Sequence, residues 1–182
     1  MKSHNDIVDK LLRVLKPAQE VQDADAAVAL LLRPRCKDTE ILLVERAQNR
    51  KDPWSGQMAL PGGKRDVQDH TMLQTALRET LEETSIRLSG ELHVLGALEN
   101  TRSGAHPSLM VAPFVILIQD EPAIRLSREL VGHMWIPLYK LPACKGTARL
   151  PSGEVPAYVV GDRAVWGLTY RILEKFFKAL RS

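Results

Sequence analysis

Hydrophobic residues recur along this chain with two different periods, and the period predicts the type of each element. Between residues 5 and 15, Ile, Val and Leu stand three or four positions apart with charged residues between them, which predicts an amphipathic N-terminal helix within residues 1–20. The short apolar runs at 26–32 and 40–44 are typical of buried strands. The Pro-Arg-Cys-Lys-Asp segment between them predicts a turn, so the two strands are expected to pair.

The clearest helical pattern lies at residues 71–84, where apolar and small residues form one stripe. The stripe consists of Leu73, Ala76, Leu77, Thr80 and Leu81. Because these positions repeat at the helical spacing, they predict the buried face of the helix. A closing amphipathic helix is predicted at 165–181, with Phe176 and Phe177 packed on the sheet. Self-association as a homodimer through this helix is the alternative interpretation.

Strands predominate between these helices. They are predicted at 57–60, 92–98, 109–119 and 155–160. Residues 48–55 are polar and predict a loop, Pro61-Gly62-Gly63 predicts a turn, and 127–130 predicts a short helical turn. The whole pattern is typical of one α/β (α+β) domain over residues 1–182, in which helices cover a mixed sheet, rather than of a regular alternating βαβ array.

Length and composition narrow the class of protein. A chain of 182 residues suffices for one domain with a sizeable core, and 45% hydrophobic with 26% charged residues is ordinary for a globular protein. No apolar stretch is long enough to span a bilayer, and the N-terminus lacks the pattern of a secretory signal. Two cysteines cannot form a disulfide framework or a cysteine-based zinc site. The expected location is therefore the cytoplasm.

The charge distribution bears on the expected partners. The net charge is only +3, and the chain has no run of five like charges. Aromatic residues make up 5% of the chain, which is little material for stacking bases. We therefore expect neither a nucleic acid nor a membrane as partner. A mildly basic surface suits a small anionic substrate.

The helix at 71–84 carries the most informative chemistry. On an ideal helix, Glu79, Glu82 and Glu83 fall within an arc of roughly 100° because each residue turns by about 100°. A solvated acidic face with an Arg78–Glu82 ion pair is the simpler interpretation. However, Glu79 and Glu83 repel each other at this spacing, and a divalent cation would turn that repulsion into attraction. Such hard oxygen ligands suit Mg²⁺ or Mn²⁺.

Residues 62–86 resemble a Nudix box, whose family pattern is Gly-x5-Glu-x7-Arg-Glu-U-x-Glu-Glu-x-Gly-U, with U a bulky aliphatic residue. The Arg-Glu and Glu-Glu pairs and Ile86 match directly. The stretch before the Arg-Glu pair is one residue longer than the pattern, and Asp69 stands near the place of its first Glu. Thr80 replaces an aliphatic residue, and Ser85 replaces the second Gly. The resemblance implies a Nudix-type αβα sandwich with a mixed β-sheet.

The resemblance also implies a role for each matching residue. Glu79 and Glu83 would be the principal metal ligands, and Glu82 a further ligand or a base that orients water. The carbonyl group of Gly62 would complete the site for Mg²⁺ or Mn²⁺. Arg78 would orient a carboxylate through hydrogen bonds. The general base of the family varies in position, and here Glu82, or a loop carboxylate such as Glu99 or Glu121, is a candidate.

Residues 42–69 are similar to the segment that marks the coenzyme A pyrophosphatase branch of the Nudix family. The matching residues are Leu42, Leu43, Arg46, Gly56, Gln57, Pro61, Gly62 and Gly63. Trp54 stands where that branch has His, and this loop is one residue longer. The segments 111–115 and 166–169 also resemble the branch. Substrate contacts are accordingly expected from Arg46, Trp54, Gly56 and Gln57, with Trp54 either stacking on adenine or acting as a structural plug.

The resemblance implies metal-dependent hydrolysis of a nucleotide diphosphate linkage. Coenzyme A or a derivative is the leading substrate, and the products would be adenosine 3′,5′-bisphosphate and phosphopantetheine. The departure at Trp54 keeps other substrates open, namely nucleoside triphosphates, ADP-ribose, nucleotide sugars and dinucleotides. A non-catalytic domain that binds a nucleotide is the alternative of a different class, although all three carboxylates are present.

Overall fold

The computed structural model describes residues 4–35, 38–47, 56–88, 94–104, 106–119, 121–151 and 153–182. The α-helices in these ranges are α1 (His4–Val14), α2 (Met72–Thr84) and α3 (Gly167–Arg181), and short 3₁₀ helices are η1 (Ala18–Glu20) and η3 (Leu141–Cys144). The larger sheet contains β1 (Ala26–Arg35), β2 (Asp38–Arg46), β3 (Met58–Ala59), β4 (Gly62–Lys64), β5 (Val94–Ala97), β6 (Thr101–Arg102), β7 (Met110–Leu117) and β8 (Leu130–Pro137). A smaller sheet contains β9 (Lys145–Leu150), β10 (Gly153–Val160) and β11 (Arg163–Trp166).

The larger sheet is mixed, as the sequence predicted. Its main path runs β3-β2-β1-β7-β5, with β4 paired to β1, β6 to β7 and β8 to β2. β1 and β7 pair in parallel, whereas β1 pairs with both β2 and β4 in the antiparallel sense. The two ends of β1 therefore have different neighbours: β2 pairs with its second half and β4 with its first three residues. This division brings β4 to the edge where β1 begins.

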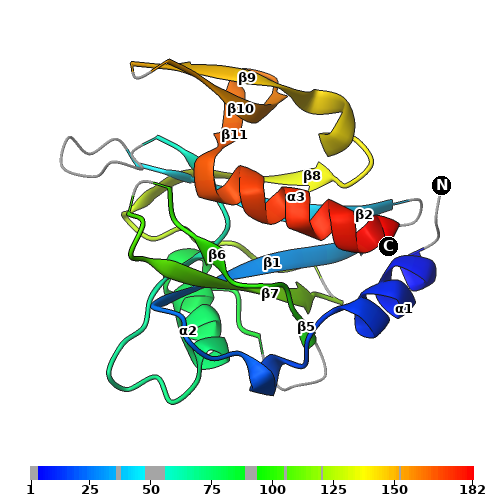
Figure 1. Ribbon diagram of the computed structural model, residues 1–182, viewed down its shortest axis with the longest axis vertical. Helices are drawn as coiled ribbons and strands as arrows, with labels where there is room; N and C mark the ends of the chain where they lie inside the picture. The colour runs from blue at the N-terminus through cyan, green and yellow to red at the C-terminus, as the bar shows by residue number, and fades with distance from the viewer. Residues whose placement is uncertain are drawn as a thin grey trace.

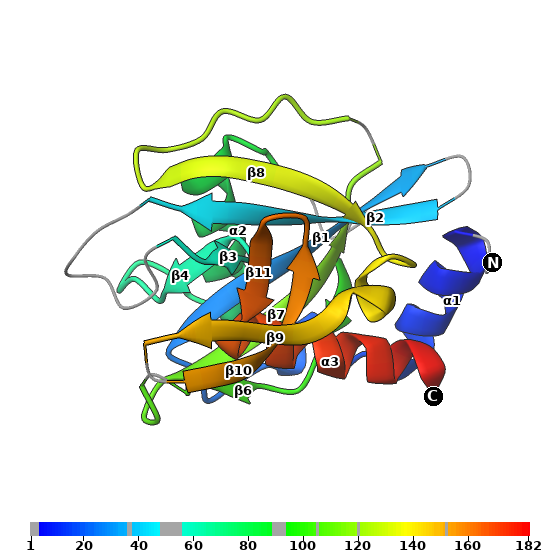
Figure 2. The same ribbon diagram turned by 90° about the horizontal axis from the view of Figure 1, so that it is seen from above.

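Helices cover both faces of this sheet, because successive side chains of β1 point to opposite sides. Leu30 and Leu32 belong to the core cluster that includes α1 and α3. Ala29 and Leu31 belong to the cluster that includes α2. Figures 1 and 2 show α3 on one side of the central strands and α2 on the other. The expected sandwich of a mixed sheet between helices is confirmed.

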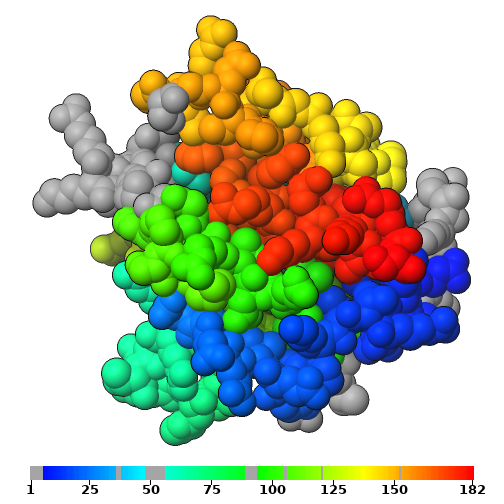
Figure 3. Space-filling model, in the orientation of Figure 1, coloured from blue at the N-terminus to red at the C-terminus, as the bar shows by residue number. Residues whose placement is uncertain are grey.

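The last helix completes the core and joins the two ends of the chain. Phe176 and Phe177 are buried in the cluster that also contains Ile7 and Leu11 of α1. Figure 3 shows α1 in blue beside the red C-terminal segment on the surface of the molecule.

In the ranges that the structure describes, no helix combines the length and the apolar character needed to cross a bilayer.

Several elements differ from the sequence prediction. The short turn expected at 127–130 is present, since the N–H of Leu130 donates to the carbonyl oxygen of Ser127 at 3.3 Å, but it does not continue as a helix because Leu130 begins β8. β8 has the pattern Leu-Val-Gly-His-Met-Trp-Ile-Pro, without clear alternation, and its pairing with β2 along Glu40–Arg46 holds it as a strand. β9 and β11 were likewise not predicted. The Pro-Gly-Gly segment, expected as a turn, enters β4.

The buried face of α2 also differs from the predicted stripe. Leu81 is 37% exposed, and Leu73 and Leu77 are only half-buried. The fully buried residues are small: Ala76 and Thr80 belong to the predicted stripe, whereas Thr75 and Thr84 do not. Small side chains let the helix lie close to β1 and β4, which are its main neighbours. That close approach brings the carboxylates of α2 to β4.

Candidate active site

A cavity of about 470 Å³ lies where the start of β1, β4, α2 and the start of α3 meet. Its polar lining brings together most of the residues that the sequence singled out: Arg46, Gln57, Gly62, Glu79, Glu82 and Glu83. Its apolar lining comes mainly from β1, β3, β7 and α3 and includes Val28, Ala59, Leu109, Val111, Leu168 and Ile172. Residues more than 120 positions apart in the sequence therefore share one concave surface.

Glu83 is the most deeply buried carboxylate of this cavity. It is 6% exposed, and the N–H of Gly62 donates a hydrogen bond to its Oε2 at 2.9 Å. Burial raises the pKa of Glu83 to about 7, because the charged form loses its hydration. The Gly62 N–H and the nearby charge of Arg46 act in the opposite direction, whereas Glu79 and Glu129 add repulsion. A buried carboxylate of this kind favours a cation in its neighbourhood.

The two glycines of β4 allow this close approach. Gly62 has φ +151°, and a Cβ there would lie 2.3 Å from the carbonyl oxygen of Ala27 in β1. A Cβ on Gly63 would lie 2.5 Å from Cδ of Glu79. Any side chain at these positions would therefore push β4 away from β1 or displace the Glu79 carboxylate. The two glycines of this segment are therefore required by packing at the site.

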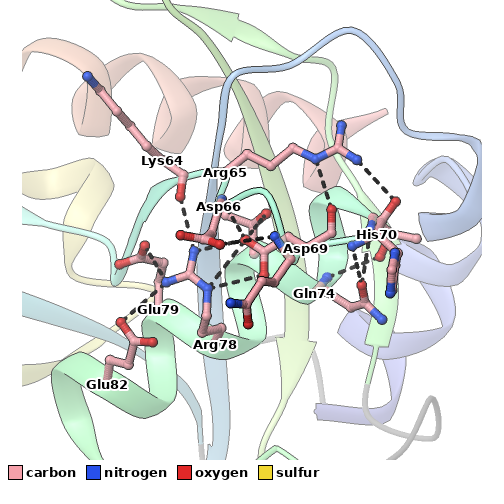
Figure 4. Close-up of polar contacts among 12 residues, drawn as sticks. Lys64, Arg65, Asp66, Asp69, His70, Gln74, Arg78, Glu79 and Glu82 are labelled. Carbon is pink, nitrogen blue, oxygen red and sulfur yellow. Dashed lines mark hydrogen bonds and ion pairs between the residues drawn. The ribbon is translucent and has the colours of Figure 1, made fainter.

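Asp69 and Arg78 form the centre of a polar network beside the cavity (Figure 4). The Arg78 guanidinium donates from Nη2 to Asp69 Oδ2 at 2.9 Å, and from Nη1 to Glu79 at 2.8 Å and to Glu82 at 3.2 Å. Asp69 is 6% exposed and also accepts a hydrogen bond from the hydroxyl of Thr75. The hydrogen bonds from Arg78 hold the pKa of the Asp69 carboxyl well below its usual range.

This network fixes the start of α2 relative to β4. Thr71 caps the helix, and a capping box links it to Gln74. The Arg78 Nη2 group also donates to the carbonyl oxygen of Lys64, at 3.1 Å. Arg78 thus joins the loop, the helix and β4 while it orients two carboxylates. These hydrogen bonds are of the kind that the resemblance implied for Arg78, and its role in catalysis stays a prediction.

A search of protein-family models matches residues 23–154 of this chain to the NUDIX domain. This match covers more than half of the chain. The protein belongs to the Nudix family. The helices α1 and α3 extend beyond the matched range but pack into the same core cluster. The matched range includes residues 62–86, the segment that resembles a Nudix box.

Relatives and solved structures support the same family. The chain is 32% identical over 157 residues to the uncharacterised Nudix hydrolase NudL of Yersinia pestis, covering 80% of this chain and 75% of that protein. It is 39% identical over 122 residues to an uncharacterised protein of Schizosaccharomyces pombe, which covers 63% of this chain. The chain spans only 37% of that yeast protein and 56% of the NudL of Yersinia enterocolitica.

Two solved structures show the same fold. The NUDIX domain of Shewanella oneidensis NrtR, determined with ADP ribose, has a TM-score of 0.60 at 18% identity and covers 94% of this chain and 97% of its own. A MutT/nudix family protein from Enterococcus faecalis has a TM-score of 0.61 at 17% identity, covering 100% of this chain and 76% of its own. At such identities the likeness concerns the fold alone.

The departures from the Nudix pattern have structural explanations. Asp69, near the place of the first Glu, makes the ion pair with Arg78 despite its shorter side chain. Ser85, which replaces the second Gly, ends α2 in the left-handed conformation with φ 60°. A glycine adopts this conformation without strain, so the family pattern and the backbone agree at this position. Ser85 donates its hydroxyl to the carbonyl oxygen of Arg125 at 3.2 Å.

The carboxylate oxygens are suitable ligands for a divalent cation. Their side chains must change conformation before they can bind the same cation. Among the described residues, no three His, Cys, Asp or Glu side chains are close enough to form a metal centre as they stand. Arg78 holds Glu79 and Glu82, whereas Glu83 is bonded to Gly62. All three nevertheless line one cavity and offer hard oxygen ligands. Their assignment as ligands therefore stays a prediction.

Glu129 is a cavity residue that the sequence analysis did not identify. It precedes β8, lines the cavity and lies close enough to Glu79 and Glu83 to raise the pKa of both. Only the pairing of β8 with β2 brings Glu129 there. Because β8 was not predicted, the position of Glu129 could not be predicted either. Glu121, one of the loop carboxylates considered as a base, is instead bonded to Arg33 and Arg35, roughly 20 Å along β1 from the cavity.

The other predicted contacts differ in position. Glu99 is not part of the cavity lining, and its carbonyl oxygen accepts a hydrogen bond from Lys175 at 3.2 Å. Gly56 is absent from the described lining too; its N–H donates to the carbonyl oxygen of Arg46 at 3.1 Å and closes the turn into β3. Trp54 lies outside the described residues.

Replacement of Gly63 by Ala tests the contact between β4 and Glu79. Because the new Cβ would lie 2.5 Å from the Glu79 carboxylate, we expect that side chain to move. The Mg²⁺ concentration needed for half-maximal turnover should rise about tenfold or more, the scale on which loss of ligand support weakens metal sites. Gly146→Ala is the control, because its Cβ would meet Val159 at an ordinary 3.5 Å. An unchanged Mg²⁺ requirement in Gly63→Ala would show that Glu79 does not need its present position.

Proposed function

We propose that this Nudix protein is a hydrolase that uses Mg²⁺ or Mn²⁺ to cleave the diphosphate linkage of a nucleotide derivative. The observation that carries the proposal is the buried Glu83 in one cavity with Glu79, Glu82 and the cation Arg46. A divalent cation bound by the carboxylates would neutralise phosphate oxygens and lower the pKa of a bound water. The cavity volume of about 470 Å³ lies within the ordinary range for small-molecule sites.

Each residue has a distinct task under this proposal. Glu79 and Glu83 would hold the cation, together with the carbonyl group of Gly62. Arg78 keeps Glu79 and Glu82 oriented through its hydrogen bonds. Removal of a proton from the attacking water falls to Glu82 or Glu129, because both carboxylates line the cavity.

Coenzyme A or a derivative is the leading substrate. Support comes from the similarity of residues 42–69 to the coenzyme A pyrophosphatase branch, and from the placement of Arg46 and Gln57 in the cavity lining. Arg46 is a suitable partner for a phosphate. Hydrolysis would give adenosine 3′,5′-bisphosphate and phosphopantetheine. The crystallised NrtR domain was bound to ADP ribose, so ADP-ribose is the compound to compare first.

A substrate panel tests the proposal directly. Purified protein with Mg²⁺ or Mn²⁺ would be given coenzyme A, acetyl-coenzyme A, ADP-ribose, a dinucleoside polyphosphate, NADH and nucleoside triphosphates, with products separated by chromatography. We expect coenzyme A to be cleaved fastest. If another compound were cleaved faster, the proposal of a metal-dependent hydrolase would stand, and that compound would replace coenzyme A as the leading substrate. If no compound were cleaved with either metal, the proposal of a hydrolase would fail in favour of a nucleotide-binding domain.

A further inference from the structure

The segment 125–129, which leads into β8, lies against the last turn of α2. The N–H of Arg125 donates to the carbonyl oxygen of Thr84 at 2.9 Å. The N–H of Ser127 donates to the carbonyl oxygen of Glu83, also at 2.9 Å. The last carbonyl groups of an α-helix have no partner within it. Two of these groups find their partners in this segment, which is thereby fixed to the turn that carries Glu83.

Ser127 also fixes Glu129 at the cavity. Its hydroxyl oxygen accepts a hydrogen bond from the N–H of Glu129 at 3.3 Å. The carbonyl oxygen of Glu129 accepts another from the N–H of Ala47 at 2.8 Å, and β8 continues from there beside β2 (Figure 2). Through its main chain and its side chain, Ser127 therefore joins Glu83 to Glu129.

The four carboxylates that line the cavity differ in their partners. Glu79 and Glu82 accept hydrogen bonds from Arg78, at 2.8 and 3.2 Å, and Glu83 accepts one from a backbone N–H. Glu129 is exposed, and within the described ranges no hydrogen bond or ion pair engages its carboxylate. Both of its oxygens are therefore available to a molecule in the cavity.

Glu129 is also close to both predicted metal ligands. Burial is the main cause that raises the pKa of Glu79 and of Glu83, and the charge of Glu129 adds to both shifts. Because such an interaction weakens with distance, the three carboxylates are neighbours. A water molecule near Glu79 and Glu83 therefore has Glu129 beside it. Glu82, the other candidate base, is engaged by Arg78.

We propose that Ser127 is a positioning residue, which holds Glu129 where its carboxylate accepts the proton of the attacking water. As the water oxygen bonds to phosphorus and the bond from phosphorus to the leaving phosphate oxygen breaks, that proton passes to Glu129. This inference rests on the proposed function, and it assigns the base to Glu129 rather than to Glu82. Glu129 is then the catalytic residue, and Ser127 acts through it from outside the Nudix box.

The first experiment compares the two candidate bases. With a saturating concentration of the compound that is cleaved fastest in the panel, Glu129→Gln should lower kcat about 100-fold or more and leave KM within about twofold. Glu82→Gln should cost clearly less. A larger fall of kcat in Glu82→Gln than in Glu129→Gln would assign the base to Glu82 and overturn the inference.

Metal binding distinguishes a base from a further ligand. Mn²⁺ would be titrated into the full-length protein without substrate, and the EPR signal of the free ion would give its Kd. We expect Glu129→Gln to change this Kd by less than about threefold, because only a nearby charge is lost. A rise of about tenfold or more, typical of lost ligand support, would make Glu129 part of the metal site instead of the base.

The role of Ser127 is tested by a double-mutant cycle. Ser127→Ala removes the hydroxyl that accepts from Glu129 and keeps the main-chain bond to Glu83, so kcat should fall about fivefold. Ser127→Thr keeps a hydroxyl and should stay within about twofold of the unchanged protein. In the Glu129→Gln background, Ser127→Ala should lower kcat by less than about twofold, because the group it positions is already lost.

Ser182→Ala is the matched control for Ser127→Ala. It removes an exposed hydroxyl that is bonded to the backbone at 3.1 Å, at the end of α3, and should leave kcat unchanged. A merely structural effect of Ser127→Ala would lower kcat equally with and without Glu129. That result would overturn the positioning role.

The outcomes also separate this inference from the proposed function. If the protein cleaves no compound, the proposed function fails, and this inference fails with it. If it cleaves a substrate but Glu129→Gln keeps kcat within about threefold, Glu129 is not the base. The inference is then wrong, and the hydrolase stands.

Discussion

Glu83→Gln should abolish metal-dependent turnover while the fold remains intact. The amide oxygen can still accept the hydrogen bond from Gly62, but the negative charge that would hold the cation is lost. We expect kcat to fall by at least about a thousandfold, equivalent to about 4 kcal/mol of lost transition-state stabilisation. The measurement is hydrolysis of the best panel substrate over a range of Mg²⁺ concentrations. Near-normal activity would exclude Glu83 as a metal ligand.

Glu154→Gln is the matched control for this variant. Glu154 lies in β10 with its side chain 57% exposed, and it pairs only with the exposed Arg149 among the described residues. The same loss of one negative charge should therefore leave turnover unchanged. A similar fall of activity in both variants would attribute the effect to net charge rather than to the cavity.

The free energy of unfolding, measured without metal, is a second test of Glu83→Gln. The pKa of Glu83 is about 7 in the folded protein against 4.5 for a free glutamate, so the folded state binds more protons between these values. The free energy of unfolding of the metal-free protein should therefore fall as pH rises through this window. Glu83→Gln lacks this ionisation and should be more stable than the unchanged protein at pH 8, by about 1 to 3 kcal/mol. Denaturant unfolding at several pH values measures the difference.

Arg78→Met should destabilise the protein and lower its activity. The substitution leaves Asp69, only 6% exposed, without its cation, and breaking a buried ion pair costs about 3 kcal/mol or more. Because Arg78 itself is 29% exposed, we expect the lower end of that range, about 3 kcal/mol. Glu79 and Glu82 also lose the group that orients them, so kcat/KM should fall about 10- to 100-fold.

The pH dependence identifies Asp69 as the cause of that destabilisation. Its pKa is lowered in the folded protein from the usual 3.8, so its contribution is complete above that value and is lost as pH falls further. The stability difference between Arg78→Met and the unchanged protein should therefore be largest at neutral pH and should shrink below about pH 4. A difference that stays constant down to pH 2 would contradict this explanation.

Arg149→Met provides the comparison for Arg78→Met. Arg149 pairs with Glu154 at 3.3 Å, but the two side chains are 86% and 57% exposed. Exposed pairs contribute little, so the free energy of unfolding should change by less than about 0.5 kcal/mol. Equal destabilisation by both substitutions would show that burial of Asp69 is not the decisive factor.

The helices and strands that were predicted correctly are those whose own residues carry a clear pattern. The helix predicted at 71–84 was confirmed, because its spacing and the Thr71 cap are local features. The strands predicted at 26–32 and 109–119 were confirmed because continuous apolar runs are typical of a strand covered on both faces. β8 lacks such a run, and its pairing with β2 was not visible from its own residues. The prediction therefore missed Glu129 as well.

The predicted stripe of α2 shows the same limit within a correct helix. Large apolar residues favour burial in general, yet Leu81 of the predicted stripe is exposed, whereas Thr75 and Thr84 outside it are buried. Which face of a helix is buried depends on what approaches it, and β4 approaches through Gly62 and Gly63. The sequence could indicate a turn at Gly62 and Gly63, but it could not show that these residues pair with β1.

By itself, the sequence determined the family, the mixed sheet between helices and the carboxylates of the Nudix box, because these depend on residue type and local spacing. Only the tertiary structure decided how those residues are used. Burial against β4, not its place on the helix, gives Glu83 its raised pKa. The pairing of β8 with β2 adds Glu129 to the same cavity. Such contacts join segments that are far apart in the sequence, and the residues of one segment do not reveal which other segment it will contact.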